Sequence, residues 1–233
     1  MSATMDVSQR IGEVMALDHA APALCYQSRW WDWGACDRLG TELDAALAGR
    51  VGTRPGTPVA VVMRNRPGHV ATILHLLRRR YCLVPISSIQ APGRIADDVR
   101  AQRPPVVVAD AEDWSDELTK AARDCGALGL RFTESAVEVV VAGDGDPDGY
   151  PLREGTAVWM PTSGTTGPPK RIPITYADLD IGFDRVRRYA GANERAASAA
   201  RLSSGVVISC TPLVHIAGLW QVFQSAVEGR RLV

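Results

Sequence analysis

Short apolar runs alternate with amphipathic stretches along most of the chain. Four runs have the length and composition of buried strands: 57–63 (TPVAVVM), 81–86 (YCLVPI), 104–110 (PPVVVAD) and 156–160 (TAVWM). Helical spacing fills the gaps, first from Pro67 with Val70, Ile73, Leu74 and Leu77, then over 95–103 and 115–125. Strands separated by helices of this length are joined by crossover connections. The pattern therefore predicts an α/β fold with mainly parallel sheets and flanking helices.

The later part of the chain follows a polar segment rich in Gly, Pro and Asp at 142–151, which suggests a sub-boundary near 143–155. We expect a short strand at 172–175 and another buried strand at 205–213. Two further helices are predicted by shared faces, the first formed by Tyr176, Leu179, Phe183 and Val186, the second by Leu219, Val222, Phe223 and Ala226. Gly229 is a plausible stop signal for the second helix.

The last four residues, 230–233 (RRLV), read as the start of one more strand. An unfinished strand at a terminus would leave an open sheet edge. We therefore expect that the chain was cut from something longer, and that the open edge would favour a homodimer.

The charge balance excludes several function classes. Twenty-six basic residues face 26 acidic ones, so the formal net charge is zero and nothing draws the chain generally to nucleic acid or an anionic membrane. No run reaches the roughly 18 apolar residues of a membrane helix, and no secretory signal is visible at the N-terminus. The run Arg78–Arg80 is predicted to be a solvated helix end.

The cysteines and lysines of the sequence limit the cellular compartments and the kinds of chemistry that we expect. The five cysteines are scattered without a CxxC pair, which argues against a disulfide framework or a structural zinc site and indicates a cytoplasmic protein. Only two of the 26 basic residues are lysines, Lys120 and Lys170. A lysine in an arginine-rich chain is either incidental or needed as a compact, flexible ammonium.

The segment 162–170 carries the strongest chemical signal. Its residues are Thr162, Ser163, Gly164, Thr165, Thr166, Gly167, Pro168, Pro169 and Lys170. Two glycines allow inward-pointing backbone N–H groups, four hydroxyls add donors, and the lysine brings a positive charge, which together suit a polyphosphate. The spacing is neither a Walker A loop nor a dinucleotide fingerprint. The alternative is a flexible Ser/Thr/Gly turn between two strands.

This signature resembles the phosphate-binding segment of the adenylate-forming superfamily, which includes acyl- and aryl-CoA synthetases and nonribosomal peptide adenylation domains. Three flanking segments, 30–47, 58–87 and 210–233, are similar to the family's segments in the same order, so the resemblance spans about residues 20 to 233. It implies that a carboxylic acid attacks ATP to give an acyl-adenylate, and that a thiol then takes the acyl group. The thiol would be coenzyme A or the pantetheine arm of an acyl carrier protein.

The resemblance also implies residue roles. The loop 162–170 would hold the phosphates, with Thr162 helping to hold Mg²⁺ and Lys170 neutralising charge as a catalytic residue. His215 would be a second catalytic residue, at the wall of the substrate pocket near the adenylate, and Trp220 would line the acyl tunnel. A helix-capping or packing role for His215, and a core role for Trp220, are the alternatives.

Two positions depart from the family's pattern. Arg171 stands where the family usually has Gly after the signature lysine, and we favour a solvent-facing guanidinium over an added phosphate contact. His215 stands where amino-acid-activating relatives have an Asp that pairs with the substrate's ammonium. Since burying an ammonium without a counter-ion is costly, we expect a fatty or aryl acid as substrate.

Several family segments have no match in the 233 residues, including the adenine-binding segment, the ribose-binding Asp and the small C-terminal domain with its lysine. We therefore interpret residues 1–233 as the N-terminal part of an adenylation domain that is inactive alone. Two other hypotheses stay open. One is a non-catalytic interaction domain that keeps the fold, and the other is an unrelated phosphate-binding protein with a different sheet order.

Overall fold

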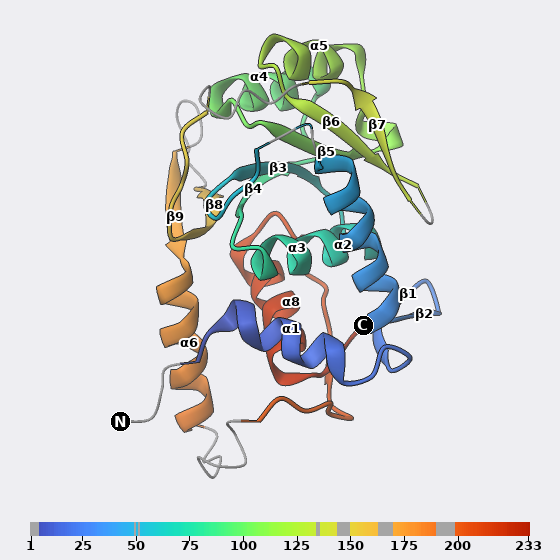
Figure 1. Ribbon diagram of the computed structural model, residues 1–233, viewed down its shortest axis with the longest axis vertical. Helices are drawn as coiled ribbons and strands as arrows, with labels where there is room; N and C mark the ends of the chain where they lie inside the picture. Colours follow the sequence, from blue (N-terminus) through green and yellow to red (C-terminus); the bar gives the residue numbers. More distant parts are fainter. Residues whose placement is uncertain are drawn as a thin grey trace.

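The structure is a computed structural model that describes residues 5–48, 50, 52–133, 136–143, 150–162, 170–189 and 199–233, with the backbone alone at 187–189. A seven-stranded sheet runs through the described part of the chain in the order β7-β6-β5-β3-β4-β8-β9 (Figure 1). Its strands are β3 (Pro58–Met63), β4 (Cys82–Ser87), β5 (Val106–Asp110), β6 (Leu128–Phe132), β7 (Val137–Val141), β8 (Thr156–Pro161) and β9 (Arg171–Thr175). The five inner strands are parallel, while β7 and β9 are antiparallel to their neighbours. The α/β, mainly parallel fold is thus confirmed.

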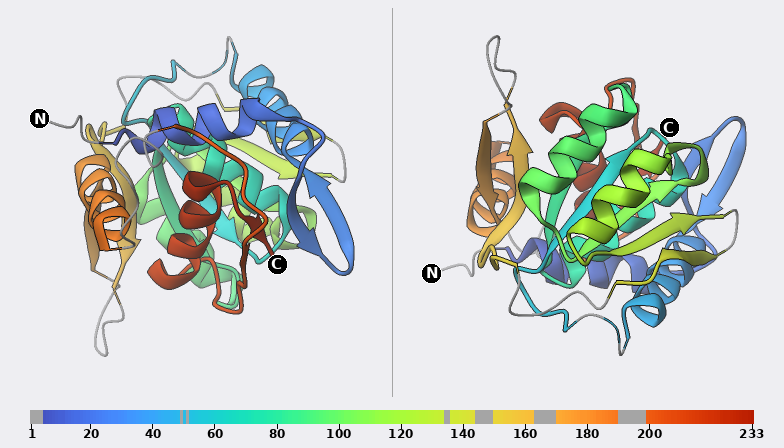
Figure 2. Two further views of the ribbon diagram at one scale, coloured as in Figure 1. Left: turned by 90° about the horizontal axis from the view of Figure 1, so that it is seen from below. Right: turned by 90° about the horizontal axis from the view of Figure 1, so that it is seen from above.

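Helices cover both faces of this sheet, as Figure 2 shows. One face carries α4 (Pro92–Gln102) and α5 (Asp116–Asp124), and the other carries α1 (Val7–Leu17), α2 (Trp33–Leu47), α3 (Pro67–Arg78) and α8 (Ile216–Glu228). Alternate residues of β3 enter the two cores, Val59 and Val61 on the α3 side, Ala60 and Val62 on the α4 side. Burial on both faces explains why this strand is apolar throughout.

A second, four-stranded sheet has the order β10-β11-β1-β2. Its strands are β1 (Pro22–Tyr26), β2 (Arg29–Asp32), β10 (Val206–Val207) and β11 (Arg231–Leu232). The strand expected at 230–233 is present, but the open edge is not. Because β11 pairs with β10 on one side and with β1 on the other, the argument for a homodimer through that edge is wrong.

The buried strand predicted over 205–213 is also wrong. Only Val206–Val207 forms a strand, and Ile208 is 69% exposed. Since β10 lies at the edge of the small sheet, only one of its sides is paired, and the side chain of Ile208 that follows it meets solvent. The sub-boundary near 143–155 stays a prediction, and residues 144–149 lie outside the described residues.

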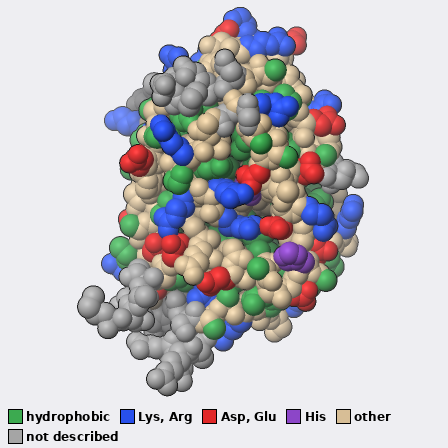
Figure 3. Space-filling view, in the orientation of Figure 1, with side chains coloured by type: hydrophobic (Ala, Val, Ile, Leu, Met, Phe, Trp, Pro, Cys, Tyr) green, Lys and Arg blue, Asp and Glu red, His purple; other side chains and the backbone are tan. Residues whose placement is uncertain are grey.

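The arginines that end α3 and follow it are not simply solvated. Arg78 pairs with Asp37 at 2.5 Å, Arg79 pairs with Asp44, and Arg80 pairs with Asp6 at 2.5 Å. These partners belong to α2 and to the cap of α1, so the three pairs join neighbouring helices. Basic and acidic side chains are likewise intermixed on the face in Figure 3. Within the described part of the chain, every helix is too short or too polar to cross a bilayer.

Candidate functional site

The signature segment connects two antiparallel strands of the large sheet. β8 and β9 pair down to Pro161 and Arg171, and Thr162 then faces Lys170. The backbone N–H and the hydroxyl of Thr162 both donate to the carbonyl of Lys170, at 2.7 and 2.9 Å. These two hydrogen bonds close the loop at its root, and we call the Thr162–Lys170 pair the neck of the loop. Ser163, Gly164, Thr165, Thr166 and Gly167 lie outside the described residues.

The two lysines have different surroundings. Lys120 lies on α5 and pairs with Asp124 at 2.8 Å, one helical turn away, as expected for a solvated helix face. Lys170 is exposed at the neck, and no carboxylate of the described residues pairs with its ammonium.

Thr162 fits the magnesium role that the resemblance implies. Its hydroxyl proton is directed to the carbonyl of Lys170, which leaves oxygen lone pairs free. Oxygen is the ligand atom that Mg²⁺ prefers. No cluster of three or more His, Cys, Asp or Glu side chains suited to a metal occurs among the residues that the structure describes.

The prediction that Arg171 faces solvent is wrong. Its side chain is only 3% exposed and forms an ion pair with Asp98 of α4 at 2.6 Å. The guanidinium also donates to the carbonyls of Pro85 in β4 and Trp159 in β8, at 3.1 and 2.9 Å. The side chain enters the gap between the sheet and α4, because a buried carboxylate and two carbonyls there compensate its desolvation.

His215 stands at the start of α8 and is exposed. It is the N-cap residue, but its side chain accepts no capping hydrogen bond. The segment before it is fixed by Asn65, whose amide donates to the carbonyl of Thr211 at 3.0 Å and accepts from the N–H of Leu213 at 2.9 Å. Sequence reasoning missed Asn65; a polar residue between a buried strand and the Pro that opens a helix is the available signal.

Gly218 is a second residue that sequence reasoning missed. A Cβ at this position would lie 2.5 Å from the carbonyl oxygen of Pro212 and 2.9 Å from that of Thr211. The first turn of α8 can approach the preceding segment only because the side chain is absent. Gly218 therefore helps to place His215, which lies between Pro212 and Gly218 in the sequence.

Trp220 follows Gly218 on α8 and is half-buried. Its ring stacks on Phe183 of α6 (Tyr176–Tyr189), with ring centroids 4.4 Å apart and planes 2° from parallel. Within the described chain, no hydrogen bond, ion pair or ring contact joins Thr162 or Lys170 to His215 or Trp220. The structure thus brings the neck residues together and holds the two α8 residues on a separate element.

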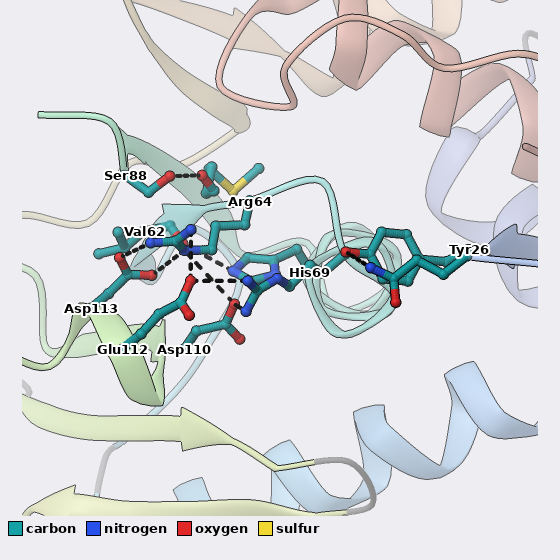
Figure 4. A network of polar contacts seen from close by, with 11 residues as sticks. Tyr26, Val62, Arg64, His69, Ser88, Asp110, Glu112 and Asp113 are labelled. Carbon is teal, nitrogen blue, oxygen red and sulfur yellow. Dashed lines mark hydrogen bonds and ion pairs between the residues drawn. The ribbon is translucent and has the colours of Figure 1, made fainter.

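A polar network occupies the carboxyl edge of β3 and β5 (Figure 4). Arg64 binds Asp113 through two hydrogen bonds of 2.8 and 2.7 Å, and Arg66 pairs with Asp110 at 2.7 Å. Glu112 bridges the two arginines. Although ligands often bind at such an edge, these groups satisfy one another here, so the network stabilises the loops instead of presenting free charge.

One cavity of about 160 Å³ lies between β1, β11, the start of α3 and the segment before α8. Its lining is mainly apolar and includes Leu24, Val70, Leu213 and Leu232. Of the predicted site residues that the structure describes, Thr162, Lys170, His215 and Trp220, none lines this cavity.

Comparison with known proteins matches the chain to a family. The family model described as AMP-binding enzyme covers residues 13–233. An isonitrile lipopeptide synthase of Mycobacterium tuberculosis (strain ATCC 25618 / H37Rv) is 25% identical over 98% of this chain, which spans 8% of that protein. A 2-succinylbenzoate–CoA ligase of Bacillus velezensis (strain DSM 23117 / BGSC 10A6 / LMG 26770 / FZB42) is 33% identical over 40% of this chain, or 17% of its own length.

A solved structure agrees with this fold. The ATP-bound MatB of Rhodopseudomonas palustris has 17% identity and a TM-score of 0.72, over 97% of this chain and 44% of MatB. The chain therefore spans less than half of this structure and of both curated relatives, and its fold corresponds to the N-terminal large domain of such enzymes. An unrelated protein with a convergent loop is excluded by the family match. This chain belongs to the AMP-binding, adenylate-forming enzyme superfamily.

Proposed function

We propose that this chain supplies the phosphate-binding part of an acid–thiol ligase, which activates a carboxylic acid with ATP and passes the acyl group to a thiol. The observation that carries the proposal is the neck of the loop. Thr162 and Lys170 are hydrogen-bonded to each other at the root of a signature loop, with the ammonium of Lys170 unpaired among the described residues.

The physical task of such a site is to bring two anions together. A carboxylate must approach the α-phosphate of ATP, and their repulsion raises the barrier unless nearby cations and N–H donors offset it. Lys170 would bind a phosphate oxygen through its ammonium and stabilise the negative charge that leaves with pyrophosphate. Thr162 would hold Mg²⁺, which supplies further charge neutralisation when bound. The two hydrogen bonds already hold Thr162 to the backbone of Lys170 before ATP binds.

His215 supports a fatty or aryl acid as the substrate. An α-amino acid would bring an ammonium to the start of α8, where this chain has an imidazole in place of a carboxylate. No acidic residue occurs in α8 before Glu228, at the far end of the helix. An uncompensated ammonium would be unfavourable there. Coenzyme A is one acceptor consistent with the proposal, because one relative is named as a CoA ligase. The pantetheine arm of a carrier protein is the other.

The first experiment tests ATP binding by titration calorimetry with magnesium present. We expect Lys170→Ala to weaken ATP binding by about 10- to 150-fold, since a charged hydrogen bond contributes about 1.5–3 kcal/mol. Lys120→Ala is the matched control, because it removes the other lysine from an exposed ion pair. Equal ATP affinity of the two variants would contradict the proposal. Unfolding of Lys170→Ala would instead assign the lysine a structural role.

The second experiment measures pyrophosphate release by the 233-residue chain with fatty, aryl and amino acids. We expect the chain to bind ATP weakly at best and to show no turnover. In a longer polypeptide that carries these residues, pyrophosphate exchange should respond to fatty or aryl acids. Robust release by the chain alone would refute its expected inactivity, and loss of ATP binding altogether would favour a non-catalytic interaction domain.

A further inference from the structure

Arg171 is part of a closed ring of four side chains and one carbonyl. Its guanidinium Nη2 pairs with Asp98 Oδ2 at 2.6 Å, and Asp98 Oδ1 accepts from the amide of Gln102 at 3.4 Å. The other end of that amide, Gln102 Oε1, accepts from the indole N–H of Trp159 at 3.0 Å. The carbonyl of Trp159 accepts from Arg171 Nη1 at 2.9 Å, which closes the ring.

The ring connects α4 to the strands β8 and β9 through side chains, in addition to the backbone pairing of the two strands. Asp98 and Gln102 lie on successive turns of α4, Trp159 lies on β8, and Arg171 begins β9. A further hydrogen bond from Arg171 reaches the carbonyl of Pro85 on β4. β9 is the last strand in the described sheet and pairs only with β8, so the ring is its main connection to α4.

The charges in the ring are nearly enclosed. Exposed fractions of the side chains are 3% for Arg171 and 14% for Asp98. The guanidinium of Arg153 lies over the ring of Trp159, 3.9 Å from its centroid. Removing the Asp98 charge would therefore leave Arg171 beside a second cation and without a counter-ion.

Arg171 directly follows Lys170, whose carbonyl accepts both hydrogen bonds from Thr162. Any shift of Arg171 would therefore move the neck of the loop. We propose that Arg171 and Asp98, linked through Gln102 and Trp159, are positioning residues that fix this neck and direct Lys170 toward bound ATP. This inference rests on the proposed function, and it assigns a role to an arginine at a position where the resembling family usually has Gly.

The test compares two neighbouring aspartates of α4. Asp98→Asn removes the buried charge of the ring, whereas Asp97→Asn makes the same chemical change in an exposed pair, where Asp97 is 70% exposed and contacts Arg100 at 3.1 Å. We expect Asp98→Asn to weaken ATP binding by about tenfold, the lower range for partners of a ligating group. Asp97→Asn should match the unchanged chain. Arg171→Lys keeps the ion pair with Asp98 but cannot reach both carbonyls, so its ATP affinity should lie between the affinities of the two aspartate variants. If Asp98→Asn does not fold, Arg171→Lys tests the inference in its place.

Hydrogen exchange and a double-mutant cycle separate positioning from general destabilisation. The N–H of Thr162 should exchange at least about tenfold faster in Asp98→Asn, while amides of the inner strand β3 keep their protection. In the Lys170→Ala background, Asp98→Asn should no longer affect ATP affinity, because the effect passes through the lysine. An unchanged Thr162 exchange rate, or equal losses of affinity in both backgrounds, would overturn the inference. If the unchanged chain binds no ATP, the proposed function fails, and the exchange measurement alone decides whether the ring holds the neck.

Discussion

Replacing Gly218 by Ala tests whether the close approach of α8 to the preceding segment is rigid. In an open helix this change stabilises by up to about 1 kcal/mol, because glycine has the more flexible unfolded chain. Here the new Cβ would lie 2.5 Å from the carbonyl oxygen of Pro212 and 2.9 Å from that of Thr211, and both are backbone atoms. Overpacking of this kind costs about 1–3 kcal/mol. We expect a net destabilisation of about 1–2 kcal/mol.

Gly12 of α1 is the matched control, because its nearest foreign atom is the flexible Arg78 side chain at 3.7 Å. Gly12→Ala should therefore stabilise by about 0.5–1 kcal/mol. The assay is urea unfolding followed by circular dichroism, with the free energies of unfolding compared at equal m-values. If Gly218→Ala proves as stabilising as Gly12→Ala, the segment before α8 yields to the side chain and Gly218 does not fix His215.

Two further predictions concern buried titratable groups. Burial lowers the pKa of His69 below its ordinary 6.5, even though Asp110 nearby opposes the shift. The unfolded chain therefore takes up this proton first, so stability is complete above about pH 6.5 and falls at lower pH, by up to about 1.4 kcal/mol per pH unit. His69→Gln should remove that slope from the free energy of unfolding measured between pH 7 and 5. Burial likewise raises the pKa of Cys36 and of Cys82 to about 12. A thiol reagent at pH 8 should label the exposed Cys210 quickly and these two cysteines only on unfolding; fast labelling of either would contradict their burial.

Strands β3, β4, β5 and β8 of the large sheet could be predicted because they are mostly buried on both faces. In β3 every side chain is buried, so its apolar run and length identified it without further information. The amphipathic faces of α3 and α8 were equally clear, and Gly229 does end α8 with a positive φ of 63°. Strands β6 and β7 were missed: Gly129 and Arg131 interrupt the apolar pattern of β6, and β7 lies at the edge of the sheet with Glu138 and Val139 exposed.

The candidate site was only partly readable. The signature placed Thr162 and Lys170 correctly on one loop, since a nine-residue pattern depends on local sequence. The environment of Arg171 was not readable, because Asp98, Gln102 and Trp159 come together only when α4 packs on the sheet. Arginine after a phosphate-binding lysine suggests a surface residue, and tertiary contacts over 73 positions of sequence reversed that reading.

The small sheet has a consequence for the order in which the molecule can form. Leu24 of β1 faces Leu232 of β11, so this pairing joins the two ends of the described chain. On a ribosome the β1–β2 hairpin would wait, with one side unpaired, until the residues up to Leu232 were synthesised. The loop that must then close is long, and such distant pairing slows folding. The open side of the hairpin is consequently a place where a chaperone could bind the nascent chain until β11 is synthesised.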